Sequence, residues 1–215
     1  MDVFEAIYAR RSVRKYKKGA PVAKESIQKL LDAAMHAPSA VNSRPWEFYC
    51  SDKEEVKASL MAAHPACRML ETAGWAIVVC GRPDLQPRHN YWPQDCGAAV
   101  ENILLAAKGL GLGACWCGCY PTQPRTDEVK KVIGCDGVPV AIVAVGVPDE
   151  DPPRKGILRR GTGTFSVKGR AAAICRGAFF IQIIFLLSFL FLFCPSPLSA
   201  LSLCTVFPQK APPTP

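Results

Sequence analysis

The chain has 215 residues, of which 49% are hydrophobic and 20% are charged, which is typical of a globular protein and excludes a largely disordered one. The length supports one domain with a full core but not two large ones. The formal net charge of +8 is uneven, because residues 151–215 hold eight of the 26 Lys and Arg and one of the 18 acids. The nearly neutral remainder shows neither a recognition helix nor basic residues interleaved with aromatics, so we expect no nucleic-acid partner.

Apolar periodicity predicts mainly helices in the first part of the chain. A short helix is expected over Val3–Arg10, with its apolar residues on one side. A clear amphipathic helix follows over Lys24–Ala37 and ends at Pro38. Trp46–Cys50 is then expected as a strand and Lys53–Ala63 as a helix.

The second part of the predicted domain alternates more evenly. Ala76–Gly81 is a continuous apolar run of strand length, which predicts burial on both faces. A long helix over Asp95–Leu110 precedes a strand over Ala114–Cys119, a helix over Asp127–Ile133 and a strand over Val140–Val147. Long helices first and an irregular alternation favour an α+β layer sandwich over a doubly wound parallel sheet.

The eleven cysteines are an odd number, and no secretory signal precedes them, because Met1–Arg14 is charged and lacks an apolar run. We therefore expect reduced thiols in a cytoplasmic protein. Cys115, Cys117 and Cys119 would share one face of a strand. Zinc sites usually add a second, distant pair of ligands, and the three histidines show no such pairing. We expect small buried residues here and no metal.

The first cluster able to carry chemistry is Arg10–Arg14 (RRSVR), directly after the first predicted helix. Its three guanidinium groups suit bidentate binding of phosphate, and the Ser12 hydroxyl can add a hydrogen bond. A solvated basic stretch would have the same pattern, so the pattern alone leaves both interpretations open.

The second cluster is Pro38–Trp46 (PSAVNSRPW), where two prolines fix a loop between a helix and a strand. The loop presents Ser39, Asn42 and Arg44, which can hydrogen-bond a planar heterocycle. An ordinary polar loop at a helix end is the alternative.

The third cluster is Gly111–Pro121 (GLGACWCGCYP). Glycines of a dinucleotide motif follow a strand and open a helix, whereas these follow a helix and open a strand. A turn with Gly118 near its end can instead bring backbone amides close to a ligand ring.

Together these clusters resemble the nitroreductase superfamily. RRSVR, PSAVNSRPW, AIVVCG, YWPQDCGAAVENILLAA and GLGACWCG occur in the order and spacing of its short members. The resemblance covers residues 1–155, which we expect to form one FMN-binding domain. It implies an α+β helix/sheet sandwich with a central, mostly antiparallel sheet, in a homodimer that holds FMN at the interface.

The resemblance also implies an NAD(P)H:acceptor oxidoreductase. NADH or NADPH would reduce FMN, and the reduced flavin would then reduce a small acceptor such as a nitroaromatic or a quinone, in a ping-pong sequence. One alternative is a specialised relative such as a reductive dehalogenase, and another is a membrane-attached, catalytically weak FMN-binding or interaction protein. The cofactor performs the redox step, so we assign no catalytic side chain.

Position by position, the resemblance assigns one group of residues to the phosphate end of FMN. Arg10, Ser12 and Arg14 would hold the phosphate and the ribityl chain, with Arg11 alongside through its backbone. Arg154 would return to the phosphate from the end of the domain.

A second group would surround the flavin ring. Asn42 would bond the pyrimidine, while Pro38 and Ser39 would come from the partner subunit and cover the other side of the ring. The backbone amides of Cys117 and Gly118 would lie by N5 and O4.

The sequence departs from the family at two places. Arg44 stands where the family usually has Gln, so a cation could favour anionic substrates or simply point outward. The acidic and aromatic arm that clasps the partner subunit is missing. Residues 156–177 are expected to be a basic linker, and residues 178–215 a hydrophobic, then Pro/Ser-rich tail. Its apolar run over residues 178–194 is a membrane anchor, a mis-predicted reading frame or a buried element of the fold.

Overall fold

The computed structural model describes residues 1–153; Arg154, assigned above to the phosphate, and the tail lie outside the described residues. Every predicted helix and strand is present, with ends that differ by a few residues. The elements, in chain order, are α1 (Val3–Ala9), α2 (Lys24–Met35), β1 (Trp46–Ser51), α3 (Glu54–Ala63), β2 (Trp75–Gly81), α4 (Trp92–Gly109), β3 (Gly113–Gly118), α5 (Gln123–Ile133) and β4 (Val138–Gly146).

Short 3₁₀ helices were not predicted, because a single turn is too short to show a periodicity. Within residues 1–153 they are η1 (Ala40–Asn42), η2 (Pro65–Glu71) and η3 (Pro83–Leu85). Two of them lie beside residues of the candidate site. η1 forms part of the predicted ring-binding loop, and η2, which follows α3, contains Ala66 and Met69, which contact the Cys117 thiol.

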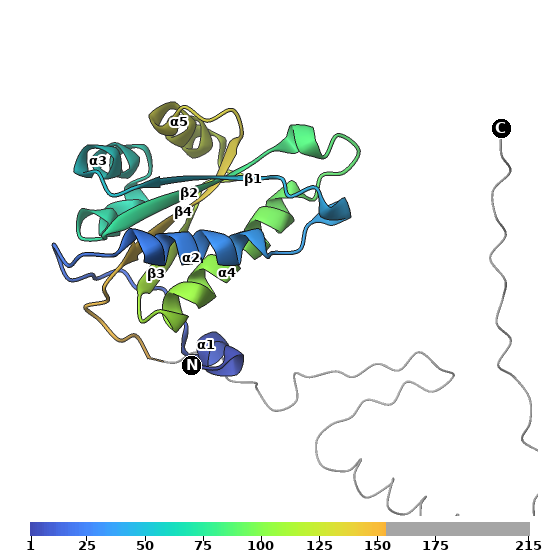
Figure 1. Ribbon diagram of the computed structural model, residues 1–215. Coiled ribbons are helices and arrows are strands. Elements are labelled where there is room, and N and C mark those ends of the chain that lie inside the picture. Colours follow the sequence, from blue (N-terminus) through green and yellow to red (C-terminus); the bar gives the residue numbers. More distant parts are fainter. Residues whose placement is uncertain (154–215) are drawn as a thin grey trace, which may run out of the picture. The chain divides into compact units, whose positions relative to one another are not determined.

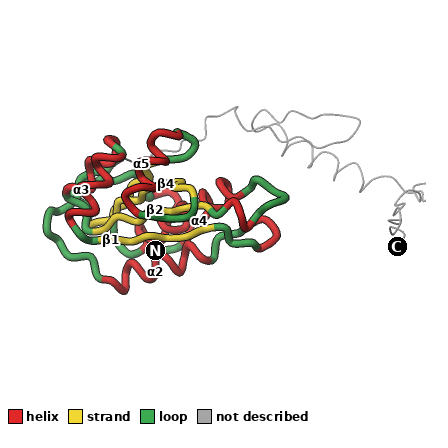
Figure 2. Tube along the Cα trace, turned by 90° about the horizontal axis from the view of Figure 1, so that it is seen from above, coloured by secondary structure: helices red, strands yellow, loops and turns green. Residues whose placement is uncertain are grey.

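The four strands form one antiparallel sheet in the order β1-β2-β4-β3. Helices α3 and α5 lie over one face, and α2 and α4 lie over the other (Figure 1). Figure 2 shows the same arrangement from above, with the yellow strands among the red helices. The predicted α+β sandwich with an antiparallel sheet is therefore confirmed.

The two central strands carry the core. β2 and β4 are buried almost throughout, as their continuous apolar runs predict. Because side chains alternate along a strand, Ile77 and Val143 pack toward α2 and α4, while Val78 and Ile142 pack toward α3 and α5. Each fully buried aliphatic side chain contributes about 1.5–3 kcal/mol, so these strands form a rigid platform between the helix layers.

Strand β3 is an edge of this sheet, and its residues alternate as the cysteine spacing predicts. Cys115 and Cys117 are buried on the α3/α5 face, and Cys119 just beyond the strand is buried with them. Trp116, which points the other way over Gly97 of α4, is 39% exposed. The cysteines are small core residues, and the tryptophan is left at the open edge.

Helix α1 is unusual because no residue in it is buried. A capping box between Asp2 and Glu5 starts the helix. The apolar side that the sequence predicts is present, yet Val3 and Phe4 are each 62% exposed. Among the described residues, 1–153, no element covers this face.

Candidate functional site

The first predicted cluster forms a pocket. A cavity of about 570 Å³ lies at the end of α1, beside the segment that enters the sheet. Its lining residues are Arg10, Arg11, Ser12, Arg14, Lys15, Glu150 and Pro152. The structure thus brings together four of the five residues that the resemblance assigns to the phosphate end, and the fifth, Arg154, lies outside the described residues.

Backbone pairing holds this segment in place. The Val13 amide donates to the carbonyl of Ala114 on β3 at 3.0 Å. Val13 also packs against Gly113, where an added Cβ would lie 2.7 Å from a Val13 methyl carbon. Glycine is therefore required at 113, because any side chain there would push the basic segment away from the sheet.

The pocket contains more positive than negative charge, but it is not purely basic. Arg10 Nε forms an ion pair with Glu101 Oε1 of α4 at 3.0 Å. Arg11 Nε donates to the carbonyl of Pro153 at 2.8 Å. The Arg14 side chain is exposed. Planar guanidinium groups around one cavity favour an oxyanion such as phosphate.

Glu150 is a pocket residue that sequence reasoning missed. Its Oε1 accepts the backbone amides of Arg14 at 2.5 Å and Lys15 at 3.2 Å. These bonds add to the backbone pairing of the same two segments, in which the Asp149 amide donates to Lys15 O. Glu150 stands in a run of acids before two prolines, which indicated only an exit from the core, and no local pattern shows that it folds back.

The open edge of β3 presents a backbone donor. The Cys119 amide donates to Val140 O of β4 at 2.8 Å. In an antiparallel ladder the hydrogen-bonding direction alternates, so the N–H of Gly118 points away from β4 and toward the open edge. Gly118 is exposed, and no Cβ obstructs approach to its amide.

The carbonyl of Gly118 is held by two side chains from the α3/α5 layer. His64 Nε2 lies 2.9 Å from this oxygen, and Arg125 Nη1 donates to it at 3.1 Å. Sequence reasoning missed both residues: 54 residues separate His64 from Gly118, and Arg125, only seven residues away, lies in no motif that indicates a contact with a backbone carbonyl. Cys117, predicted to act through its backbone, has its thiol buried against Ala66 and Met69.

The second predicted cluster is a tight loop with left-handed backbone. Val41, Asn42 and Arg44 have φ values of 49°, 55° and 47°, a conformation that costs free energy for residues other than glycine. The Ser39 hydroxyl accepts the Arg44 amide at 3.0 Å. Arg44 Nε donates to Asn42 Oδ1 at 3.2 Å, so that the exposed amide nitrogen of Asn42 remains available as a donor. Pro38 is exposed at the start of the loop.

Buried polar groups hold this loop from beneath. Asp95 Oδ2 accepts the Ala40 amide at 3.1 Å and Gln86 Nε2 at 2.6 Å. Gln86 Nε2 also donates to Ser43 Oγ at 2.7 Å. Such a network explains how the strained backbone persists, because Asp95 is anchored in α4 and is only 9% exposed.

One chain does not bring the two halves of the predicted ring site together. The Pro38–Arg44 loop leads into β1, whereas Gly118 lies on β3, the opposite edge of the sheet. Three strand spacings of roughly 4.8 Å put these edges about 14 Å apart. The segment of the basic pocket, by contrast, pairs with Ala114 of β3, the strand that ends at Gly118.

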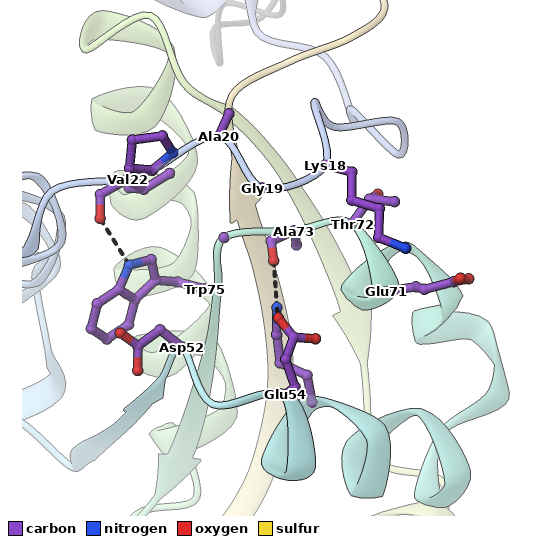
Figure 3. A pocket seen from close by; sticks show the side chains of 13 residues that line it. Lys18, Gly19, Ala20, Val22, Asp52, Glu54, Glu71, Thr72, Ala73 and Trp75 are labelled. Carbon is purple, nitrogen blue, oxygen red and sulfur yellow. Dashed lines mark hydrogen bonds and ion pairs between the residues drawn. The ribbon is translucent and has the colours of Figure 1, made fainter.

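A second cavity, of about 470 Å³, lies beside the start of β2 (Figure 3). Lys57, whose side chain is 3% exposed, donates from Nζ to Glu54 Oε1 at 2.7 Å and to Ala73 O at 2.8 Å. Trp75 Nε1 donates to Val22 O at 3.0 Å. These contacts tie α3 and β2 to neighbouring loops, and no predicted site residue lines this cavity.

Three thiols of the domain are held in their protonated form by burial. Burial raises the pKa of Cys50 to about 11, of Cys96 to about 12 and of Cys119 to about 12. The reactive thiolate is therefore scarce at neutral pH. Across residues 1–153 no three His, Cys, Asp or Glu side chains gather as metal ligands, and no helix there has the length and apolarity to cross a membrane.

Comparison with known proteins gives a consistent result. The sequence profile of the nitroreductase family matches residues 7–147. A Methanothermobacter thermautotrophicus protein, provisionally named an NADH dehydrogenase/NAD(P)H nitroreductase, is 42% identical over 154 residues, which are 71% of this chain and 80% of that protein.

Solved structures share the fold. A crystal structure from Parabacteroides distasonis, with the same provisional name, has a TM-score of 0.71 and 38% identity, and covers 78% of this chain and 98% of its own. A provisionally named nitroreductase from Desulfovibrio desulfuricans, solved in complex with FMN, has a TM-score of 0.63 and 27% identity, and covers 74% of this chain and 93% of its own.

Proposed function

Because the chain belongs to the nitroreductase family, we propose that it is an FMN-dependent oxidoreductase that transfers electrons from NADH or NADPH to a small acceptor. One observation carries the proposal. The segment that lines the guanidinium-rich pocket pairs with β3 at Ala114, and an exposed, outward-pointing backbone amide lies at the other end of that strand, at Gly118. This arrangement suits a ligand with an anionic end and a planar, hydrogen-bonding end.

The pocket fits the phosphate of FMN. Arg10, Ser12 and Arg14 line one cavity and supply charge-assisted and hydroxyl hydrogen bonds to an oxyanion. Arg11 would contribute through its backbone, and Arg154 would approach from beyond the described residues. A single anionic pocket favours FMN over FAD, because FAD needs a further site for its adenylate half.

The β3 edge fits the flavin ring. The Gly118 amide points outward and would donate to the N5 and O4 side of the ring, whereas the same alternation directs the N–H of Cys117, the other predicted donor, toward β4. When bound, FMN supplies the redox chemistry by accepting a hydride from the nicotinamide and passing electrons on to the acceptor. The protein supplies position, hydrogen bonds and a positive field, so no side chain acts as a catalytic residue.

We propose that the active form is a homodimer with FMN at the interface. The Pro38–Arg44 loop would complete the ring site across the interface, since within one chain it lies at the opposite edge of the sheet. Pro38 and Ser39 would come from the partner subunit, and Asn42 would donate to the pyrimidine. The exposed apolar side of α1 and Val41, which is 76% exposed, are surfaces that a second copy would cover.

A planar, electron-poor acceptor such as a nitroaromatic or a quinone suits this open site. Arg44 adds a cation near the ring site, although its bond to Asn42 directs it within its own loop. A reductive dehalogenase would use the same cofactor site. The eight free cysteines of residues 1–153 are compatible with a reducing, cytoplasmic setting.

The test uses the purified full chain. Heat release and chromatography of the cofactor should yield FMN, and anaerobic NADH or NADPH should bleach the flavin absorbance. Initial rates with a quinone should give parallel double-reciprocal lines, as a ping-pong sequence requires. A folded protein that binds no flavin would contradict the proposal and favour an interaction protein, and recovery of FAD alone would contradict the site.

A further inference from the structure

His64 occupies a joint between two elements. It ends α3, where its amide donates to Leu60 O at 2.9 Å, and it precedes η2, where its carbonyl accepts the Cys67 amide at 2.8 Å. Its side chain is 1% exposed. The backbone of His64 is therefore fixed on both sides, and burial leaves its ring little room to turn.

The ring must be a hydrogen-bond donor at Nε2. The Gly118 carbonyl, 2.9 Å away, can only accept, so Nε2 carries the proton. Nδ1 is buried and has no partner within the described residues. A second proton on Nδ1 would create a buried, unpaired charge, and burial together with the nearby Arg125 guanidinium lowers the pKa of His64. The residue is thus a neutral donor with a defined tautomer.

The residue that accepts these bonds, Gly118, has a backbone that no side chain of its own restricts. Gly118 ends β3, and it lacks the side chain that would restrict its backbone torsions. Its carbonyl receives a second bond, from Arg125 Nη1 at 3.1 Å. A buried donor from α3 and a partly exposed donor from α5 therefore hold the same oxygen, and they orient the end of the strand.

We propose that His64 is a positioning residue, which together with Arg125 clamps the Gly118 carbonyl so that the Gly118 N–H stays aimed at the ring-binding position. This inference rests on the proposed function, which places the flavin N5 and O4 at that amide. Neither side chain needs to touch the flavin. The Gly118 carbonyl and N–H belong to the two peptide units on either side of its Cα, so the clamp acts by restricting the φ and ψ torsions that relate them.

Loss of the clamp should affect the reduction of the flavin much more than the affinity for FMN. The phosphate pocket lies beside Ser12 and Ala114, at the other end of β3, so FMN affinity should change little. Reduced flavin carries more electron density at N5 and O4 than oxidised flavin, and it gains more from a well-aimed donor. The flavin should consequently become harder to reduce, and hydride transfer to it should slow.

The experiment compares three variants with the wild-type full chain. His64→Leu removes the donor, and His64→Gln restores an N–H at a similar reach. His89→Gln makes the same change at an exposed histidine outside the site. Readouts are hydrogen exchange of residues 117–120 without FMN, the FMN dissociation constant, the flavin midpoint potential and the stopped-flow rate of reduction by NADH.

We expect His64→Leu to speed exchange by about tenfold, the effect of losing one ordinary hydrogen bond. The midpoint potential should fall by about 30 mV, which is a tenfold change for a two-electron couple. FMN affinity should stay within about threefold, because bonds at the phosphate pocket are untouched. His64→Gln should recover most of the potential, and His89→Gln should match the wild type.

An unchanged potential and unchanged exchange in folded His64→Leu would overturn the inference. So would a His64→Gln protein as impaired as His64→Leu, because the residue would then serve packing alone. If His64→Leu does not fold, Arg125→Met tests the same clamp from its exposed side, and an unchanged potential there counts against it. A wild-type protein without flavin would refute the proposed function instead, while the exchange comparison would still test the clamp.

Discussion

Glu150 sets the sharpest test of the phosphate pocket. Its carboxylate shares a cavity of about 570 Å³ with the basic residues, and its Oε1 holds the Arg14 and Lys15 amides. A phosphate bound in that cavity would feel the negative charge. Glu150→Gln keeps the acceptor oxygen and removes only the charge, so the variant separates electrostatics from structure.

The size of the effect follows from Coulomb's law. A phosphate of charge about −1.5 held about 8 Å from the carboxylate, at an effective dielectric constant of about 60, is repelled by about 1 kcal/mol. FMN should therefore bind Glu150→Gln about fivefold more tightly at low salt, because 1 kcal/mol is a factor of about five. The gain should shrink as salt screens the charges.

Fluorescence titration of the FMN-free protein with FMN and with riboflavin isolates the phosphate. Riboflavin lacks that group, so its affinity should be unchanged. Glu55→Gln, at an exposed position on α3 away from the pocket, is the matched control. Glu150→Ala also removes the amide acceptor, and it should bind FMN less well than Glu150→Gln. Equal gains for FMN and riboflavin, or weaker FMN binding by Glu150→Gln, would refute this reasoning.

Three further predictions follow from the same structure. Arg14→Ala should weaken FMN binding by about 2 kcal/mol, the scale of a charge-assisted hydrogen bond, whereas Lys17→Ala, outside the pocket, should do little; equal losses in titration would indicate a general charge effect. Phe4→Glu should shift the dimer toward monomer in sedimentation, because it charges the exposed apolar side of α1; an unchanged dimer places the interface elsewhere. Burial lowers the pKa of His64, so the unfolded chain binds a proton that the folded chain refuses, and stability should fall as pH drops below about 6.5; His64→Gln should show a shallower fall in melting temperature, and identical slopes would contradict this.

The fold could be predicted because its signals are local. The amphipathic stripe of α2 and the continuous apolar runs of β2 and β4 follow directly from side-chain periodicity. The pattern of buried cysteines along β3 follows from the same rule. Strand order and register could not be predicted, because pairing between distant segments leaves no local pattern in one sequence.

In the candidate site, too, residues that are contiguous in the sequence could be predicted, and residues that act from far along the chain could not. Arg10–Arg14 could be singled out because its candidate phosphate-binding groups are contiguous in the sequence, and the same residues line one pocket in the structure. His64 and Glu150 act across 54 and about 136 residues of chain, on a carbonyl and on amides that every residue possesses. Contacts from a side chain to distant backbone carry no residue-type signal at the receiving end, so one sequence cannot reveal them.

The open edge of β3 connects these observations. An unpaired edge strand invites unwanted pairing, and proteins usually cover or interrupt it. Here the segment at Val13 covers the first half of β3, and His64 with Arg125 occupies the last carbonyl. The outward N–H of Gly118 lies between these covers and faces outward from the sheet. An exposed donor held there in a rigid frame can bond water, a ligand or a second subunit, and this edge is where the flavin and the partner subunit are proposed to meet.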